Sequence, residues 1–265
     1  MGAYWMGEIK TTYDIIERVE DLLTRVGWTV LATDTLTYNS DIRKYYGVWR
    51  GTGDGNDNIY IQMRAKDVSN ILLDGMVGYD NALLWYEQPG SIQQMLGKEE
   101  QVNGTINNVK QPMFSFAGES ECYCWLFATS YHIVGVVRMS TIYESFYMGL
   151  INPVSTEKQY PYPMYIAGNS VATGSSWPNN LTGSFVFPTG GSGYLRRVDG
   201  TWREFTATPD RPSSTTTGTV FPYNTGNYKL VDNYRDTQTS AQDDMLLFPI
   251  ILQTTDPIDL CGLLY

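Results

Sequence analysis

Near the start of the chain, apolar residues recur at the three- and four-residue spacing that places them on one face of a helix. Glutamate and arginine residues lie between them. The helix is expected to begin at Thr11 or Thr12, with Thr12 as N-cap, Asp14 and Glu17 near its positive end, and Gly27 as its stop. The pattern predicts an amphipathic helix whose buried stripe is formed by Ile15, Ile16, Val19, Leu22, Leu23 and Val26.

Strand patterns follow this helix. Residues 28–32 are expected to form a strand that packs back against the helix, and residues 59–64 alternate as a half-buried strand. The strongest β signal is the hairpin of 122–128 and 133–139, where near-continuous apolar residues indicate that both faces of the strands are covered. Residues 143–151 form a further strand or one or two helical turns, because periodicity does not separate these alternatives in so short a run.

Two less regular segments lie between these strands. Residues 82–86 have strand character, and the turn-rich residues 51–58 predict a hairpin loop. The loop lacks the aspartate spacing and the distal glutamate of a calcium loop. The pair Gly51 and Gly53 is followed by a strand, whereas a dinucleotide-binding fingerprint opens a helix.

Composition divides the chain into three regions. Residues 1–168 contain the predicted helix and most predicted strands, and residues 169–226 are a Ser/Thr/Gly/Pro-rich, loop-rich insertion with short strands. Residues 227–265 return to core character, and Pro249 restricts the last strand to an edge or a bulge. We therefore expect an α+β fold, in which an N-terminal amphipathic helix packs on a mainly antiparallel β-sheet with a loop-rich insertion.

The overall composition narrows the classes of partner. Charged residues make up 17% of the chain, against about 25% in typical soluble domains. Aromatic residues make up 14%, including 20 tyrosines, which fits either a protein–protein interface or a tyrosine-rich β protein. The net charge of -10 argues against nucleic acid as a partner. The N-terminal residues do not resemble a signal peptide and no run is long enough to span a membrane, so we expect a cytosolic product without membrane contact.

No constellation of residues predicts catalysis. His132 is the single histidine, it lies in the expected turn of an apolar hairpin, and the chain has no Gly-x-Ser-x-Gly motif. Glu119 and Glu121 alternate onto one side of a strand, as a glycosidase pair would require, but adjacent carboxylates are more simply surface charges. We expect that the protein is not an enzyme and has no cofactor.

The cysteines do not predict a metal site or a disulfide. Cys122 and Cys124 flank one residue of a strand, so they point to the same face and are poorly placed to bridge. Together with the distant Cys261 and His132 they make a weak ligand set. Buried, reduced thiols are the expected state.

Tyrosine and proline are concentrated in residues 143–153 and 159–168, beside the apolar hairpin. Tyrosine suits surfaces that are dry in one state and wet in another, and Tyr-Pro-Tyr-Pro favours a stiff extended arm. The apolar tail 260–265 also needs a cover, from this subunit or its neighbour. The expected intersubunit contacts are therefore Tyr143, Phe146, Tyr147, Tyr160, Tyr162, Tyr165 and Tyr265.

Several segments have a distinctive sequence: Trp-Leu-Phe-Ala at 125–128, Ile-Val-Gly-Val-Val at 133–137, Tyr-Glu-Ser-Phe-Tyr-Met-Gly at 143–149, Gln-Tyr-Pro-Tyr-Pro at 159–163, and shorter pieces at 79–90 and 248–252. On these segments, the stretch from about 120 to 170 resembles virion structural proteins encoded in the tail modules of contractile-tailed bacteriophages. The resemblance implies a structural role in the tail or baseplate, as a ring or a tube-to-baseplate adaptor. It implies other tail proteins (tube, sheath or baseplate subunits) as partners, a homo-oligomeric ring, and a place in the virion after assembly in the host cytoplasm. The Ser/Thr-rich insertion departs from the family pattern, and no catalytic residue is carried over.

A second reading is a carbohydrate-binding β-rich module on a virion or cell surface. Seven tryptophans and 20 tyrosines are enough to supply stacking platforms for sugars. A glycan binder should be a monomer with exposed aromatic rings, whereas a virion subunit should be prone to assemble.

Overall fold

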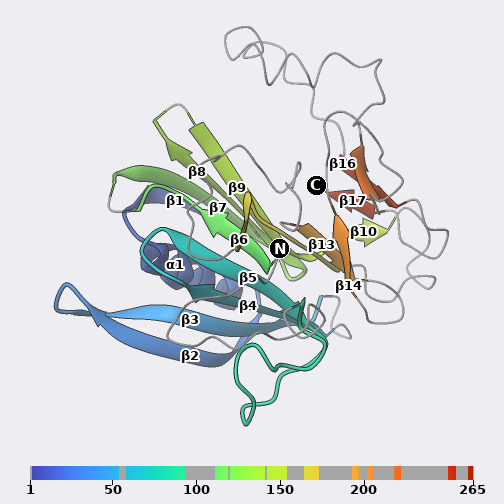
Figure 1. Cartoon of the computed structure of the whole chain (residues 1–265), viewed down its shortest axis with the longest axis horizontal. Helices are drawn as coiled ribbons and strands as arrows, with labels where there is room; N and C mark the ends of the chain where they lie inside the picture. Colours follow the sequence, from blue (N-terminus) through green and yellow to red (C-terminus); the bar gives the residue numbers. More distant parts are fainter. Residues whose placement is uncertain are drawn as a thin grey trace, which may run out of the picture.

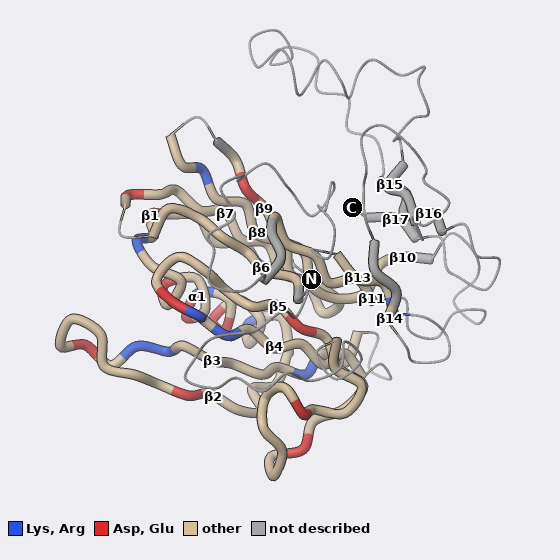
Figure 2. Tube along the Cα trace, viewed as in Figure 1, with Lys and Arg blue, Asp and Glu red and all other residues tan. Residues whose placement is uncertain are grey.

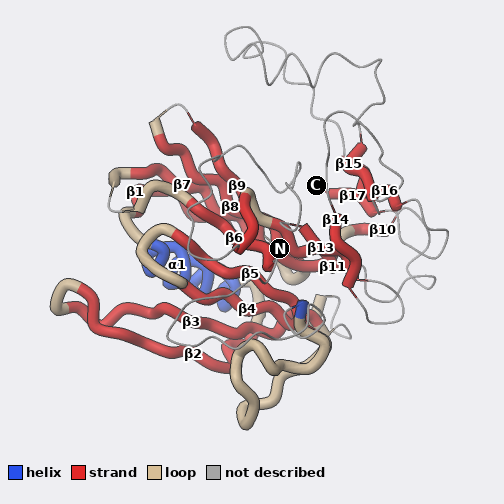
Figure 3. Tube along the Cα trace, viewed as in Figure 1, coloured by secondary structure: helices blue, strands red, loops and turns tan. Residues whose placement is uncertain are grey.

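The computed structural model describes residues 2–53, 58–92, 111–118, 120–140, 142–153, 164–172, 193–196, 202–205, 218–221, 250–254 and 262–264. These residues lie mostly in β-strands, and α1 (Thr12–Arg25) is the helix that they include over its full length (Figure 3). Two large antiparallel sheets pack on each other where β4, β5 and β6 meet β9 and β11. They diverge toward α1, which fills the space between them (Figure 1).

The first large sheet has seven strands, all paired antiparallel to their neighbours. Its two outermost strands are β1, near the N-terminus, and β14. In spatial order the strands are β1 (Ala3–Ile9), β7 (Cys122–Ala128), β8 (His132–Met139), β9 (Ile142–Leu150), β11 (Met164–Ala167), β13 (Gly193–Arg196) and β14 (Trp202–Phe205).

The second large sheet has six antiparallel strands, and a smaller four-stranded sheet lies in the C-terminal part of the chain. The six strands in order are β12 (Ser170–Ala172), β6 (Gln111–Ser115), β5 (Asn70–Met76), β4 (Ile59–Ala65), β3 (Asp41–Gly51) and β2 (Thr29–Tyr38). The four strands are β10 (Asn152–Pro153), β17 (Gly262–Leu264), β16 (Ile250–Thr254) and β15 (Gly218–Phe221).

The predicted helix is present, and its start is fixed by a capping box. Thr11 is the N-cap: its hydroxyl accepts from Asp14 N at 3.4 Å, and its own N–H donates to Asp14 Oδ2 at 2.7 Å. Thr12, the expected cap, is instead buried, and its hydroxyl donates to Asp67 O at 2.6 Å. Gly27 ends the helix with a φ of +92°, a conformation that glycine adopts without strain.

The predicted α+β fold is wrong, because the chain is mainly β and the helix does not form a layer on one sheet. α1 contacts β1 and β7 of the first sheet as well as β2, β3 and β4 of the second. Its periodicity reports that a stripe is buried, but not how many sheets bury it. The buried side chains of the stripe are Tyr13, Ile15, Ile16, Val19, Leu22 and Leu23.

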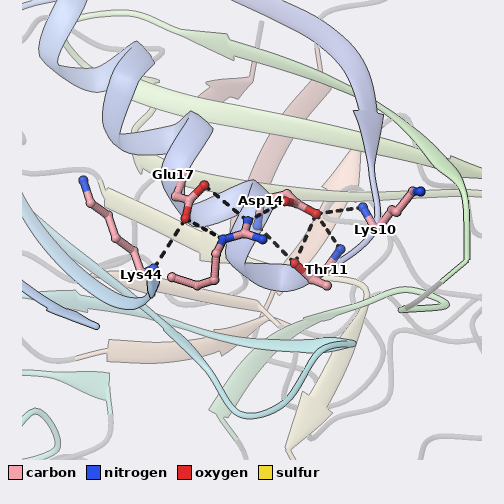
Figure 4. A network of polar contacts seen from close by, with 6 residues as sticks. Lys10, Thr11, Asp14, Glu17 and Lys44 are labelled. Atoms are coloured by element: carbon pink, nitrogen blue, oxygen red, sulfur yellow. Dashed lines mark hydrogen bonds and ion pairs between the residues drawn. The ribbon is translucent and has the colours of Figure 1, made fainter. Parts of the chain in front are cut away.

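The long β2–β3 hairpin includes a polar stretch at 33–47 that the hydrophobic pattern left unassigned. Its turn is formed by Asn39 and Ser40, whose φ angles of 49° and 70° match the left-handed pair of a type I′ turn. Arg43 Nε donates to Glu17 Oε1 at 2.9 Å, and Arg43 Nη2 donates to Asp14 Oδ1 at 2.5 Å, so this ion pair joins β3 to α1 (Figure 4). The polar stretch carries Arg43 and Lys44 because this part of β3 faces the acidic side of the helix.

Some of the other strand predictions are confirmed and some are wrong. The hairpin at 122–128 and 133–139 is confirmed as β7 and β8, and residues 143–151 are strand rather than helix. Short strands are also present near 193–195 and 201–205 as β13 and β14, and near 250–253 as β16. The expectation that this last strand is an edge or bulged strand is wrong, because β16 pairs with β15 on one side and β17 on the other, and Pro249 precedes the strand in sequence. Residues 82–86 are not a strand but turns, because the Gln88 side chain donates to the carbonyl oxygens of Asp80 and Leu83 and curls the segment.

We predict that Gly135→Ala lowers the free energy of unfolding by about 1–3 kcal/mol. Gly135 lies opposite Phe146 in the β8–β9 register, and the phenyl ring covers the glycine. An added Cβ would overlap Phe146 Cε1 and come within 2.9 Å of Leu126 Cδ2. Urea unfolding should measure the change, with Gly78→Ala as the matched control, because the nearest atom to a Cβ there is 3.9 Å away. Equal stability of the two variants would contradict the packing argument.

Candidate functional site

The most distinctive surface of the described residues is the outer face of the first sheet, on the side away from α1. Along β7, residues alternate between the core and this face, so Cys122, Cys124 and Leu126 are buried. The expectation that both faces of this hairpin are covered is therefore wrong. The uncovered side chains form what we call the outer aromatic face: Tyr4, Met6, Tyr123, Trp125, Phe127 and Tyr143.

Strand register brings these residues together from distant parts of the sequence. Tyr4 lies opposite Phe127 and Met6 lies opposite Trp125 across the β1–β7 pair. Tyr123 lies opposite Arg138, which in turn lies opposite Tyr143. Four of the six side chains are largely exposed: Tyr4 at 72%, Tyr143 at 59%, Met6 at 54% and Phe127 at 45%.

The rings of the outer aromatic face pack on one another. Trp125 lies 4.8 Å from Tyr123 and 6.3 Å from Tyr143, measured between ring centroids, and its plane is tilted by 25° from that of Tyr143. The Arg138 guanidinium lies 6.0 Å from the Tyr123 ring. Figure 2 shows that most of the length of β1, β7, β8 and β9 carries no charge. The face is therefore a preformed apolar surface with one cation at its border.

The residues expected at intersubunit contacts lie in three different environments. Tyr143 is in the outer aromatic face. Phe146, Tyr147 and Tyr165 are buried within this chain, so their burial needs no neighbouring subunit. Tyr147 also donates its hydroxyl to Leu150 O at 2.5 Å, which satisfies its polar end. The remaining three, Tyr160, Tyr162 and Tyr265, lie outside the described residues.

His132, the one candidate for acid–base chemistry, begins β8 and packs among aromatic rings. Its ring lies 5.2 Å from that of Tyr147 and 6.2 Å from that of Phe127, and its Nδ1 is 3.5 Å from Thr129 Oγ1. Burial lowers the pKa of His132 to about 4, so the ring is neutral near pH 7. These contacts give it a packing role at the end of the β7–β8 hairpin.

The sulfur and carboxylate candidates do not converge on a metal site. Cys122 and Cys124 are free thiols, and burial raises the pKa of both. Glu121 is exposed, whereas Glu119 and Cys261 lie outside the described residues. Within the part of the chain that the structure describes, no three His, Cys, Asp or Glu side chains are grouped so as to hold a metal ion.

The sequence did not indicate a polar chain that links the two sheets through the interior. Glu144 points inward from β9 and accepts a hydrogen bond from Asn169 Nδ2 at 2.9 Å. Asn169 also binds both main-chain groups of Ser115 in β6, at 2.8 and 2.7 Å. The Ser115 hydroxyl then donates to Asn70 Oδ1 at 2.7 Å. Burial raises the pKa of Glu144 to about 7.

A second buried carboxylate, Asp74, holds the segment that follows β5. It accepts hydrogen bonds from Gln62 Nε2 at 2.8 Å and from Ile92 N at 2.9 Å. Gln62 accepts in turn from the Tyr46 hydroxyl at 2.8 Å. Burial raises the pKa of Asp74 to about 7. Both carboxylates are buried and bond to interior groups, so neither lines a cleft that is open to solvent.

The chain matches no protein-family model and no curated protein sequence. Among the described residues, no helix combines the length and the apolarity that crossing a membrane requires.

We predict that Glu144→Gln flattens the pH dependence of stability between about pH 4.5 and 7. The folded state keeps the Glu144 proton up to about pH 7, whereas the ordinary pKa is 4.5, so its contribution is present below pH 4.5 and lost as the pH rises through 7. The variant should be more stable than the wild type at pH 8, by on the order of 2–3 kcal/mol.

Chemical unfolding from pH 4 to pH 8 should measure this effect. Asp74 acts in the same direction and should leave a residual slope in the variant. The control is Glu121→Gln, which makes the same change at an exposed position. A Glu144→Gln profile parallel to that of the wild type would contradict the role assigned to this carboxylate.

Proposed function

We propose that this protein is a structural subunit of a bacteriophage tail or baseplate, and that it binds a neighbouring subunit through the outer aromatic face. The observation that carries the proposal is the cluster of exposed aromatic side chains on a rigid sheet, led by Tyr4, Phe127 and Tyr143. Contiguous apolar surfaces of this kind mark interaction sites in soluble proteins. Tyrosine and tryptophan are also the residues that contribute most to binding at such sites.

The arrangement of charge supports a protein partner. The described charged side chains on this side of β1, β7 and β8 are Glu8, at the end of β1, and Arg138, at the border of the aromatic cluster. An interface of this type has a dry aromatic centre and a polar rim. Little desolvation of charge therefore opposes docking.

The phage assignment itself rests on the resemblance of residues 120–170 to tail-module proteins. Three of the matching segments, at 125–128, 133–137 and 143–149, lie in β7, β8 and β9. Of these strands, β7 contributes Trp125 and Phe127 to the outer aromatic face and β9 contributes Tyr143. The partners proposed on this basis are tube, sheath or baseplate subunits and further copies of the chain in a ring. The site of action is the virion.

Carbohydrate binding remains the second candidate, because aromatic side chains gather on one face of a sheet. Sugar stacking requires a ring face that is open to solvent. Here the Trp125 ring is flanked by Tyr123 and Tyr143, so it is less open to a sugar than a ring that stands alone. The ring packing thus favours a protein partner over a glycan.

We predict that the double variant Phe127→Ser, Tyr143→Ser folds but is not incorporated into particles. Each truncation removes an exposed ring, and ring truncations at interfaces cost about 1–2 kcal/mol or more. The test is complementation of a phage that lacks the gene, followed by quantification of the subunit in purified particles. Thermal unfolding should show that the double variant retains its fold.

The matched control is Ile42→Ser, which removes a 77%-exposed apolar side chain from the distant β2–β3 hairpin. It should be incorporated like the wild type. Normal incorporation of the double variant would contradict the proposed function. Glycan binding that the double variant loses, without any assembly defect, would establish the second candidate instead.

A further inference from the structure

β1 is an outermost strand of the seven-stranded sheet, and one of its two edges is unpaired among the described residues. It pairs with β7 over all seven of its residues, from Ala3 opposite Ala128 to Ile9 opposite Cys122, without a register shift. Within the described part of the chain, its remaining main-chain N–H and C=O groups have no hydrogen-bond partner. Such a row of free groups is a template for another strand.

The β2 edge of the second sheet, unlike the β1 edge, has a feature that normally blocks such pairing. The β2–β3 pair has two register shifts, and in the one between Val30 and Ala32 the extra residue lies in β2 itself. A bulge of this kind twists an edge away from a second strand. β1 has no bulge, no proline and no lysine, and Glu8 is its single charged residue. One molecule thus has a protected edge and an unprotected one.

The sequence of β1 is suited to pairing with itself. Residues directly opposite each other in an antiparallel pair must point to the same face of the sheet. A two-fold axis at Met6 satisfies this rule and pairs all seven residues. It places Tyr4 opposite Glu8 and Trp5 opposite Gly7, whereas an axis at Glu8 would bring two carboxylates together.

We propose that β1 pairs antiparallel with β1 of a second copy of this chain, about a two-fold axis at Met6. The pairing joins two seven-stranded sheets into one and makes their outer aromatic faces continuous. Tyr4 and Met6 of both copies then lie at the centre of the combined face. This inference deepens the proposed assembly role, on which it rests, by naming a second copy as the partner at the β1 edge.

A charge swap at Met6 tests both the partner and the axis. Met6 is 54% exposed on the outer face, so charged substitutions there should leave the fold intact. Met6→Lys alone and Met6→Glu alone each place like charges opposite each other and should weaken the dimer by about tenfold or more. An equimolar mixture of the two variants should restore it, as a heterodimer.

Sedimentation velocity over a concentration series measures each dissociation constant, and thermal unfolding verifies the fold of each variant. The matched controls are Ile42→Lys and Ile42→Glu, which should dimerise like the wild type. Hydrogen exchange should show that amides of residues 3–9 become protected as the wild-type concentration rises.

Three results would each overturn the inference: a wild type that stays monomeric at every concentration, single Met6 variants that dimerise like the wild type, or a mixture that does not recover. Protection of β1 only on addition of a different virion protein would assign the edge to that protein. The double variant Phe127→Ser, Tyr143→Ser separates this inference from the proposed function. It should still dimerise, so a failure of docking and a failure of β1 pairing give different results.

Discussion

The burial of α1 between the two sheets is the contact on which the rest of the structure depends. The sheets touch directly where β4, β5 and β6 meet β9 and β11, and elsewhere the helix separates them. Its buried side chains, such as Ile16, Val19 and Leu23, are each worth about 1.5–3 kcal/mol. Without them the inner faces of β1, β7 and β3 would lose the apolar side chains that α1 packs on them. The helix therefore fills the core at the end where the two sheets do not touch.

Ion pairs also hold α1 in place, on the side of the helix opposite to its apolar stripe. The side of α1 that faces away from the core carries Asp14, Glu17 and Glu20, and β3 presents Arg43 and Lys44 to them. Solvent-exposed ion pairs contribute little to stability, but this network is partly buried and Arg43 contacts two carboxylates. It fixes the long β2–β3 hairpin to the helix. The polar part of the hairpin around Arg43 and Lys44 is thereby held against the domain.

The sequence predicted those elements whose signals are local. The capping residues and the periodic stripe of α1 were sufficient for the helix, and the dense apolar runs of β7 and β8 were sufficient for their hairpin. The first residues of β2 were predicted, as the strand at 28–32. The polar stretch of the β2–β3 hairpin at 33–47 escaped prediction because its charged side chains match the charges of a helix that the pattern does not place beside them. Among the tyrosines, Tyr143 is exposed while Tyr147 and Tyr165 are buried, and this difference depends on register and neighbours, not on residue type.

The same limit explains the error on the outer aromatic face. A strand with two apolar faces has one pattern, whether a second layer covers it or solvent does, so residues 122–128 alone do not separate the two cases. The α+β prediction failed for a related reason. A helical stripe buried by two sheets and one buried by a single sheet are identical in sequence.

The polar link at Asn169 has a mechanical consequence. The chain leaves the first sheet after β11 and enters the second at β12, and only Gly168 and Asn169 lie between them. Asn169 clamps Ser115, and the space at Gly168 is too small for a side chain because Met113 O lies against it. Close packing and two hydrogen bonds restrict the movement of this connection. A load applied to the first sheet by a docked neighbour would pass directly into the second, so the two sheets would respond as one stiff body.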